Sequence, residues 1–197
     1  MRLSVFLTLL AVTFLAGCLP VTSKVPAGTT IGFSPDSQLL GTWRAKSTDE
    51  DESQPAFIHF LGKDDGTMVA ILVSPPHGEN LGEWDLYELH AATLGANHVL
   101  SAREVSHNGT ASTDELAAQY ILLAWRKEGA GRLTLYVMDD KATAAAIKSG
   151  EIAGAVEPGQ DGDVHITADS QALDKFLASP KAAALFNKPL VKLTRIE

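Results

Sequence analysis

Short apolar segments separated by turn-forming residues occupy the middle of this chain, and they constrain its fold more than any other feature. Lys63-Asp64-Asp65-Gly66 and Glu128-Gly129-Ala130-Gly131 are typical of tight hairpin turns, each between two apolar segments. Such short segments joined by tight turns favour an antiparallel sheet that is strongly curved or closed. The segments expected as main strands are 39–43, 55–62, 67–73, 83–91, 97–105, 119–127 and 132–138.

The periodicity changes after residue 138, where helical signals begin. Asp139 or Asp140 can cap a helix that ends before Gly150, and Asp169 or Ser170 can cap a second one, which restarts at Ser179-Pro180. Short strands are expected at 152–157 and 164–167, with a final strand at 190–196. The predicted fold class is therefore α+β. We expect an antiparallel, strongly curved or barrel-like β-sheet of about seven to nine strands, with two helices in the C-terminal third.

The N-terminal stretch reads as a secretory signal. Arg2 provides a positive charge, and the apolar run Leu3–Phe14 precedes the small residues Ala16 and Gly17. The run is shorter than the roughly 20 residues that span a bilayer. Leu15-Ala16-Gly17-Cys18 resembles the lipobox of bacterial lipoproteins. That resemblance implies a lipid thioether on Cys18 and cleavage after Gly17. The alternative is an ordinary signal peptide with a chance cysteine.

The lipoprotein resemblance predicts an organisation in three parts. These are a signal peptide at 1–17, a lipidated tether at 18–36 and a single globular domain at 37–197. The tether contains scattered Pro and Gly, and as a flexible coil it would span on the order of 20–25 Å. Acyl chains such as palmitate on Cys18 would hold the protein to the bacterial cell envelope. Because Leu19, rather than Asp, follows the cysteine, the resemblance implies the outer membrane, facing the periplasm.

Composition narrows the functional classes. The chain has 197 residues with 16 basic and 24 acidic side chains, a net charge of −8 at pH 7. This balance argues against binding to nucleic acid, which needs a basic surface. Cys18 is the only cysteine. If it is lipidated, the mature domain has no thiol chemistry and no disulfide.

Two further resemblances concern the globular part. Gly41-Thr42-Trp43 is similar to the opening of lipocalin-like barrels, in which Gly-x-Trp begins the first strand and the Trp closes one end. The order of elements, including Ile166–Phe186, resembles small bacterial proteins known only as hypothetical lipoproteins. These resemblances bear on the fold and imply no assigned activity.

One pair of histidines suggests a metal site. A tight turn at 92–96 would place His90 and His98 on the same face of a hairpin, where Glu88 could join them to bind zinc or copper. The alternative is two surface or loop histidines, which we favour. We therefore expect no metal or cofactor, and no catalytic residue is assigned.

Three functional classes remain open. The first is a membrane-anchored periplasmic module that binds an apolar small-molecule ligand or an envelope protein. The second is a structural, envelope-accessory lipoprotein, and the third is a hydrolase whose site has no recognisable motif. The absence of catalytic motifs favours the first two.

Overall fold

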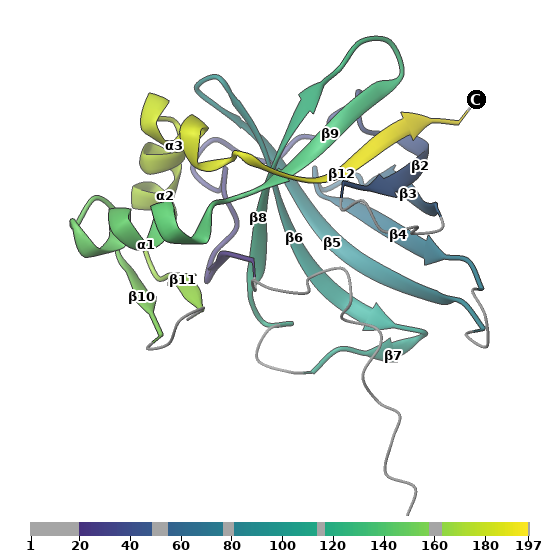
Figure 1. Cartoon of the computed structure of the whole chain (residues 1–197), viewed down its shortest axis with the longest axis horizontal. Coiled ribbons are helices and arrows are strands. Elements are labelled where there is room, and N and C mark those ends of the chain that lie inside the picture. The colour runs from purple at the N-terminus through teal and green to yellow at the C-terminus, as the bar shows by residue number, and fades with distance from the viewer. Residues whose placement is uncertain (1–19, 49–54, 77–80, 114–116, 158–162, 197) are drawn as a thin grey trace, which may run out of the picture.

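The computed structural model describes residues 20–48, 55–76, 81–113, 117–157 and 163–196, and it shows a β-barrel with helices on one side (Figure 1). Eight strands follow the order β8-β9-β12-β2-β3-β4-β5-β6, and pairing of β6 with β8 closes the ring. The eight are β2 (Gly41–Ser47), β3 (Ala56–Gly62), β4 (Met68–Ser74), β5 (Glu83–Leu94), β6 (Asn97–His107), β8 (Tyr120–Lys127), β9 (Arg132–Val137) and β12 (Lys188–Arg195). The prediction of an antiparallel, barrel-like α+β fold is confirmed.

Four short strands extend the barrel sheet. β1 (Thr22–Ser23) pairs with β8 and β11, β7 (Thr110–Ala111) pairs with β6, and β10 (Gly154–Val156) pairs with β11 (Val164–Ile166). The β6–β7 hairpin was not expected, because the strand predicted at 97–105 continues to His107 and then turns back into β7. Asn108 and Gly109 have φ of 49° and 79°, the left-handed backbone that a two-residue hairpin turn requires. The Asn-Gly pair was the signal for this hairpin.

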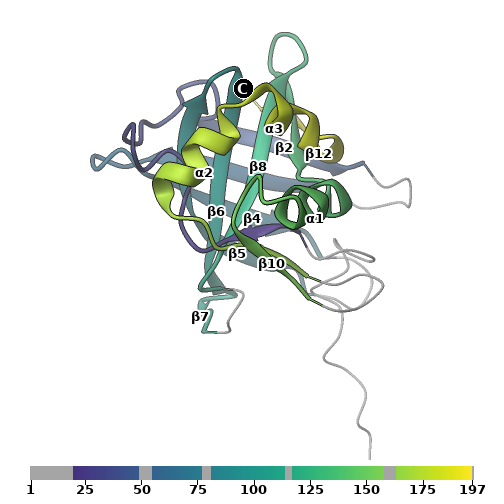
Figure 2. The ribbon, with the colours of Figure 1, turned by 90° about the vertical axis from the view of Figure 1, so that its left-hand side faces the viewer.

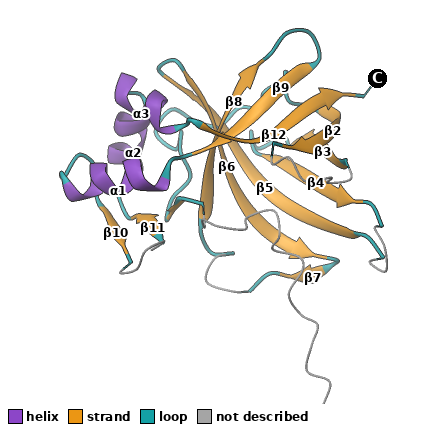
Figure 3. Cartoon of the chain, in the orientation of Figure 1, coloured by secondary structure: helices purple, strands orange, loops and turns teal. Residues whose placement is uncertain are grey.

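Three short helices lie together against one wall of the barrel (Figures 2 and 3). They are α1 (Asp140–Lys148), α2 (Ser170–Leu177) and α3 (Pro180–Leu185). Asp139 and Asp169 cap α1 and α2, each accepting a hydrogen bond of 2.8 Å from a backbone N–H. The expected restart at Ser179 forms the separate helix α3. No helix among the described residues is long and apolar enough to cross a membrane.

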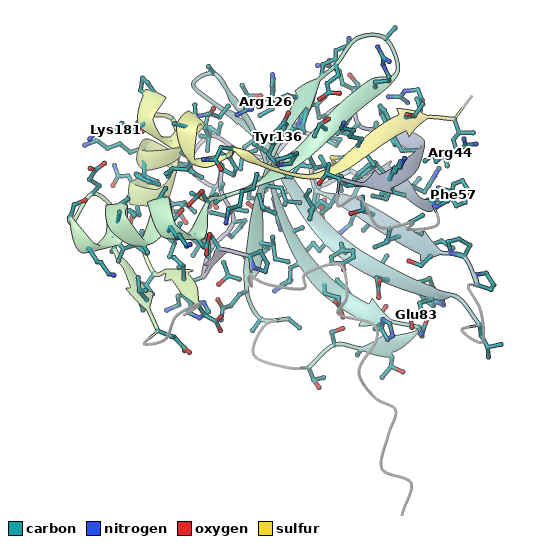
Figure 4. All side chains as sticks on the ribbon, in the orientation of Figure 1. Arg44, Phe57, Glu83, Arg126, Tyr136 and Lys181 are labelled. Atoms are coloured by element: carbon teal, nitrogen blue, oxygen red, sulfur yellow. The ribbon has the colours of Figure 1, made fainter. Side chains whose placement is uncertain are left out.

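The helices and the barrel enclose two separate cores. One lies inside the barrel, and the other lies between its outer wall and the helical layer. In the outer core, Leu122 of β8 and Val99 of β6 face Leu173 and Leu177 of α2. At the edge of this core, Arg126 of β8 stacks over the ring of Tyr136, 4.3 Å from its centre (Figure 4). Alternate side chains of β6 and β8 point to opposite faces of the sheet, so both strands contribute apolar side chains to both cores.

The described part of the expected tether is not a free coil. Val21 and Ala27 are buried, and β1 is hydrogen-bonded into the sheet. The buried Asp174 of α2 accepts hydrogen bonds from the backbone N–H groups of Gly28 at 2.6 Å and Thr30 at 2.9 Å. Scattered Pro and Gly in the sequence indicated a coil, but a distant carboxylate fixes this segment against the barrel.

Replacing Asp174 tests how this segment is held. Asp174→Ala leaves the buried Gly28 N–H without an acceptor, so we expect a loss of about 2–3 kcal/mol in the free energy of unfolding. Residues 24–33 should also become sensitive to protease. Urea unfolding and limited proteolysis measure the two effects. The control, Asp169→Ala, removes the α2 cap and should cost about 1 kcal/mol without exposing 24–33. Equal protease resistance in both variants would contradict this role for Asp174.

Candidate functional site

Large side chains fill one end of the barrel. Trp43 is 2% exposed, its Nε1 donates to the Leu39 carbonyl at 2.6 Å, and the Arg195 guanidinium lies 4.3 Å from its ring centre. Trp125 and Phe60 pack in the same core and are also buried. Gly41 begins β2, and Trp43 two residues later is buried inside the barrel.

The other half of the barrel interior is hollow. It contains a cavity of about 220 Å³. The cavity exists because four of its lining residues are alanines. Larger side chains at these positions would meet across the barrel and fill it. Side chains of β5, β8, β9 and β12 complete an almost wholly apolar wall. The lining includes Ala45, Ala56, Ala70 and Ala102, with Ile58, Leu72, Tyr87, Leu89, Ile121, Leu123, Leu135, Val137, Leu190 and Val191.

The cavity lies toward the end of the barrel where β2, β4 and β6 finish and β3, β5 and β8 begin, which we call the mouth. The burial of side chains at the two ends of the barrel supports this position of the cavity. Met68 and Leu193 at the filled end are fully buried, whereas the cavity residues Ile58 and Leu72 are only partly buried. Pro20 lines the cavity too. Cys18 lies outside the described residues, but only two positions before Pro20.

One side of the mouth is polar. Burial raises the pKa of the Tyr87 phenol above its usual range, and the nearby Asp85 and Glu104 raise it further. Tyr87 is therefore a neutral hydrogen-bond donor in the cavity wall at physiological pH. Beside it, Asp85 pairs with His107 at 2.6 Å, and Glu104 accepts a hydrogen bond from Ser112.

The histidine pair that was the less favoured alternative does not form. The β5–β6 register places His90 opposite Ser101 and His98 opposite Thr93, so the two rings are not cross-strand neighbours. His98 stacks on Trp125 with ring centres 4.5 Å apart. The actual turn is the tight Leu94–Asn97 connection. Among the described residues no three His, Cys, Asp or Glu side chains gather in a way that could hold a metal ion.

His90 instead belongs to a cluster on the outer wall. Its Nε2 donates to the Glu88 carboxylate at 2.6 Å, and Arg103 donates to the same carboxylate at 2.8 Å. Burial alone would raise the pKa of Glu88, but these hydrogen bonds outweigh it and hold the pKa below its ordinary value. The His90 ring packs edge-on against Phe33 at 4.3 Å and Tyr120 at 5.4 Å. The cluster therefore fastens the N-terminal segment to the barrel.

A Thr–His contact lies where β1, β8 and β11 meet. Thr22 Oγ1 lies 2.7 Å from His165 Nδ1, and Gln119 contacts both side chains. Because the Gln119 carbonyl oxygen only accepts, the His165 Nδ1 at 3.0 Å from it carries the proton. That nitrogen cannot then remove a proton from Thr22, which is 2% exposed. The contact joins β1, β8 and β11 and has no geometry for nucleophilic catalysis.

A second hollow lies in the helical layer. It measures about 350 Å³ between α1 and the α2–α3 pair, and its wall includes Phe176 and Lys181. Lys181, labelled in Figure 4, forms a solvent-exposed ion pair of 3.2 Å with Glu151 in the same wall. A shallow, charged hollow encloses a ligand poorly, so the barrel cavity is the candidate site.

No protein-family model, curated protein or solved structure matches this chain.

The His107–Asp85 pair predicts a pH dependence at the mouth. The hydrogen bond to Asp85 raises the pKa of His107 above its ordinary 6.5, and burial lowers it less. A raised pKa means that the pair stabilises the β6–β7 hairpin fully below about pH 6.5 and loses this effect as pH rises through the folded-state pKa. Asp85→Asn should lower the His107 midpoint in an NMR titration. Glu83→Gln, which removes a more distant charge, should lower it less. Equal midpoints in the unchanged chain and Asp85→Asn would contradict this pairing.

Proposed function

We propose that this protein is a lipid-anchored envelope protein whose barrel binds a small apolar ligand. The observation that supports this function is the apolar cavity in the mouth half of the barrel. Its volume of about 220 Å³ exceeds the roughly 150 Å³ of an engineered apolar cavity that stays dry and accepts benzene. It is smaller than the roughly 300–1,000 Å³ of pockets for drug-sized molecules. The ligand is therefore a short alkyl or aromatic compound, or the end of a longer chain.

The polar side of the mouth restricts the head of that ligand. Tyr87 can donate a hydrogen bond to an alcohol or carbonyl oxygen. Asp85 and Glu104 lie near enough to raise the pKa of Tyr87, and they would repel a carboxylate head in the same way. A neutral head, as in a fatty alcohol, fits this arrangement better than that of a fatty acid.

The anchor is the second part of the proposal. The lipobox-like Leu15–Cys18 supports acylation of Cys18, and with Leu19 next it supports the periplasmic face of the outer membrane. Multiple acyl chains would hold the protein stably at that membrane. A ligand-binding barrel at this place would take apolar compounds from the periplasm or from the membrane. Failure to bind any apolar compound would instead favour the structural, envelope-accessory role.

Filling the cavity tests ligand binding. Ala70 is buried and lines the cavity, so Ala70→Phe should occupy the ligand's space at little cost in stability. We expect calorimetric affinity for octanol to fall at least about tenfold, a loss of about 1.4 kcal/mol. In the unchanged chain, octanoate should bind more weakly than octanol.

The matched control for this substitution is Ala155→Phe, at an exposed position of β10 outside the cavity lining. It should leave octanol binding unchanged. Binding that is equal in both variants, or that is absent from the unchanged chain, would refute the cavity as a ligand site.

Removing the cysteine tests the anchor. Cys18→Ala in the full chain should abolish acylation, so the protein should leave the membrane fraction or retain its uncleaved signal. Fractionation and intact mass measure both results. Thr8→Ala, a change within the apolar run, keeps the lipobox and should leave the lipid mass and location unchanged. A Cys18→Ala protein that stays in the membrane at the mass of the unchanged processed form would disprove lipidation.

A further inference from the structure

Apolar side chains gather on the outer wall of the barrel beside the mouth. Phe57, Val73 and Trp84 are directly opposite one another across β3, β4 and β5, and Leu81 precedes β5. Val73 and Trp84 are each 41% exposed, and Leu81 is 93% exposed. We call these four residues the rim patch. Adjacent large apolar side chains exposed to water are typical of contact surfaces.

The backbone of Trp84 is fixed in place. Its N–H donates to the Asn108 side-chain oxygen at 2.9 Å, and its carbonyl accepts from the Asn108 N–H at 2.8 Å. The ring lies over Gly109, where an added Cβ would sit 3.4 Å from it. The two other tryptophans, Trp43 and Trp125, are 2% and 3% exposed inside the barrel. The fold therefore presents one tryptophan at the surface and holds it beside the mouth.

The described chain begins at the same place. Pro20 lines the cavity, and two residues span about 7 Å at most, so a lipid on Cys18 would be attached within that reach of the cavity lining. A lipid on Cys18 would enter the bilayer from this end. Because residues 20–33 are fastened to the barrel, no long tether separates the mouth from the membrane.

We propose that the rim patch docks on the membrane surface around the anchor, so that the mouth of the cavity faces the lipid. This inference goes beyond ligand binding and rests on the proposed acylation of Cys18. Tryptophan favours the membrane–water interface, where its ring meets both apolar and polar groups. The chain carries a net charge of −8, and charges of both signs border the patch: Glu83 precedes Trp84, and Arg44 of β2 is directly opposite Phe57 (Figure 4). The preferred surface is therefore zwitterionic rather than anionic lipid.

Quenching by brominated lipid tests this contact. The full chain, purified in its acylated form from bacterial membranes, is placed in phosphatidylcholine vesicles with brominated acyl chains. Trp84 is one of three tryptophans, so we expect loss of up to about a third of the emission. The Trp84→Phe variant should lose almost none, because Trp43 and Trp125 are buried. Added phosphatidylglycerol should reduce the quenching.

Two leucines provide a matched comparison. Leu81→Ser should reduce quenching of Trp84, whereas Leu61→Ser, at an exposed position beyond the filled end, should not. Equal quenching of the unchanged chain and Trp84→Phe would overturn the docking surface. Acrylamide, a quencher dissolved in water, gives a further check on the membrane-derived sample. If neither brominated lipid nor acrylamide quenches Trp84, a protein covers the rim patch, and docking on lipid would also be overturned.

The test separates docking from the other proposals. Ala70→Phe should block octanol and leave quenching by lipid unchanged, so ligand binding can fail while docking holds. A protein that does not float with the vesicles contradicts the anchor and the docking together. A protein that floats with Trp84 unquenched contradicts docking alone.

Discussion

Side-chain size changes along the inside of the barrel, and the position of the candidate site depends on this gradient. The interior of an eight-stranded barrel is just wide enough for side chains to fill. Trp43, Phe60 and Trp125 fill one half, whereas Ala45 and Ala70 belong to a group of alanines that leaves the other half hollow. The wall of a hollow loses dispersion contacts. A ligand of suitable shape would restore those contacts, which is the physical reason for expecting one.

Under the proposed function, the N-terminal segment would link this hollow to the membrane. A flexible tether would have allowed the barrel any orientation, but hydrogen bonds from Asp174 and the packing of His90 on Phe33 fix residues 20–33 on the barrel wall. The proposed lipid on Cys18 would therefore be attached near the mouth. The cavity, the rim patch and Pro20, where the described chain begins, share one end of the molecule, which relates the proposed ligand to the proposed membrane contact.

The sequence was sufficient for the barrel strands and the helical caps, but not for the short strands β1 and β7 or for the site. Alternating apolar residues and turn signals located the eight barrel strands and the helical caps at Asp139 and Asp169. Periodicity shows which residues share a face but not which strands meet, so the β6–β8 pairing that closes the barrel could not be derived. The cavity depends on side-chain volumes from all eight strands. The His90–His98 pairing, the less favoured alternative, does not form because the turn joins Leu94 to Asn97 and so sets a different register.

Native mass spectrometry of the full chain, released gently from bacterial membranes, tests the central claim most directly. The account predicts that a small apolar molecule accompanies the protein, that organic solvent extracts it, and that the Ala70→Phe protein lacks it. A chain that carries no such molecule, and gains no mass when octanol is added in excess, would contradict the account.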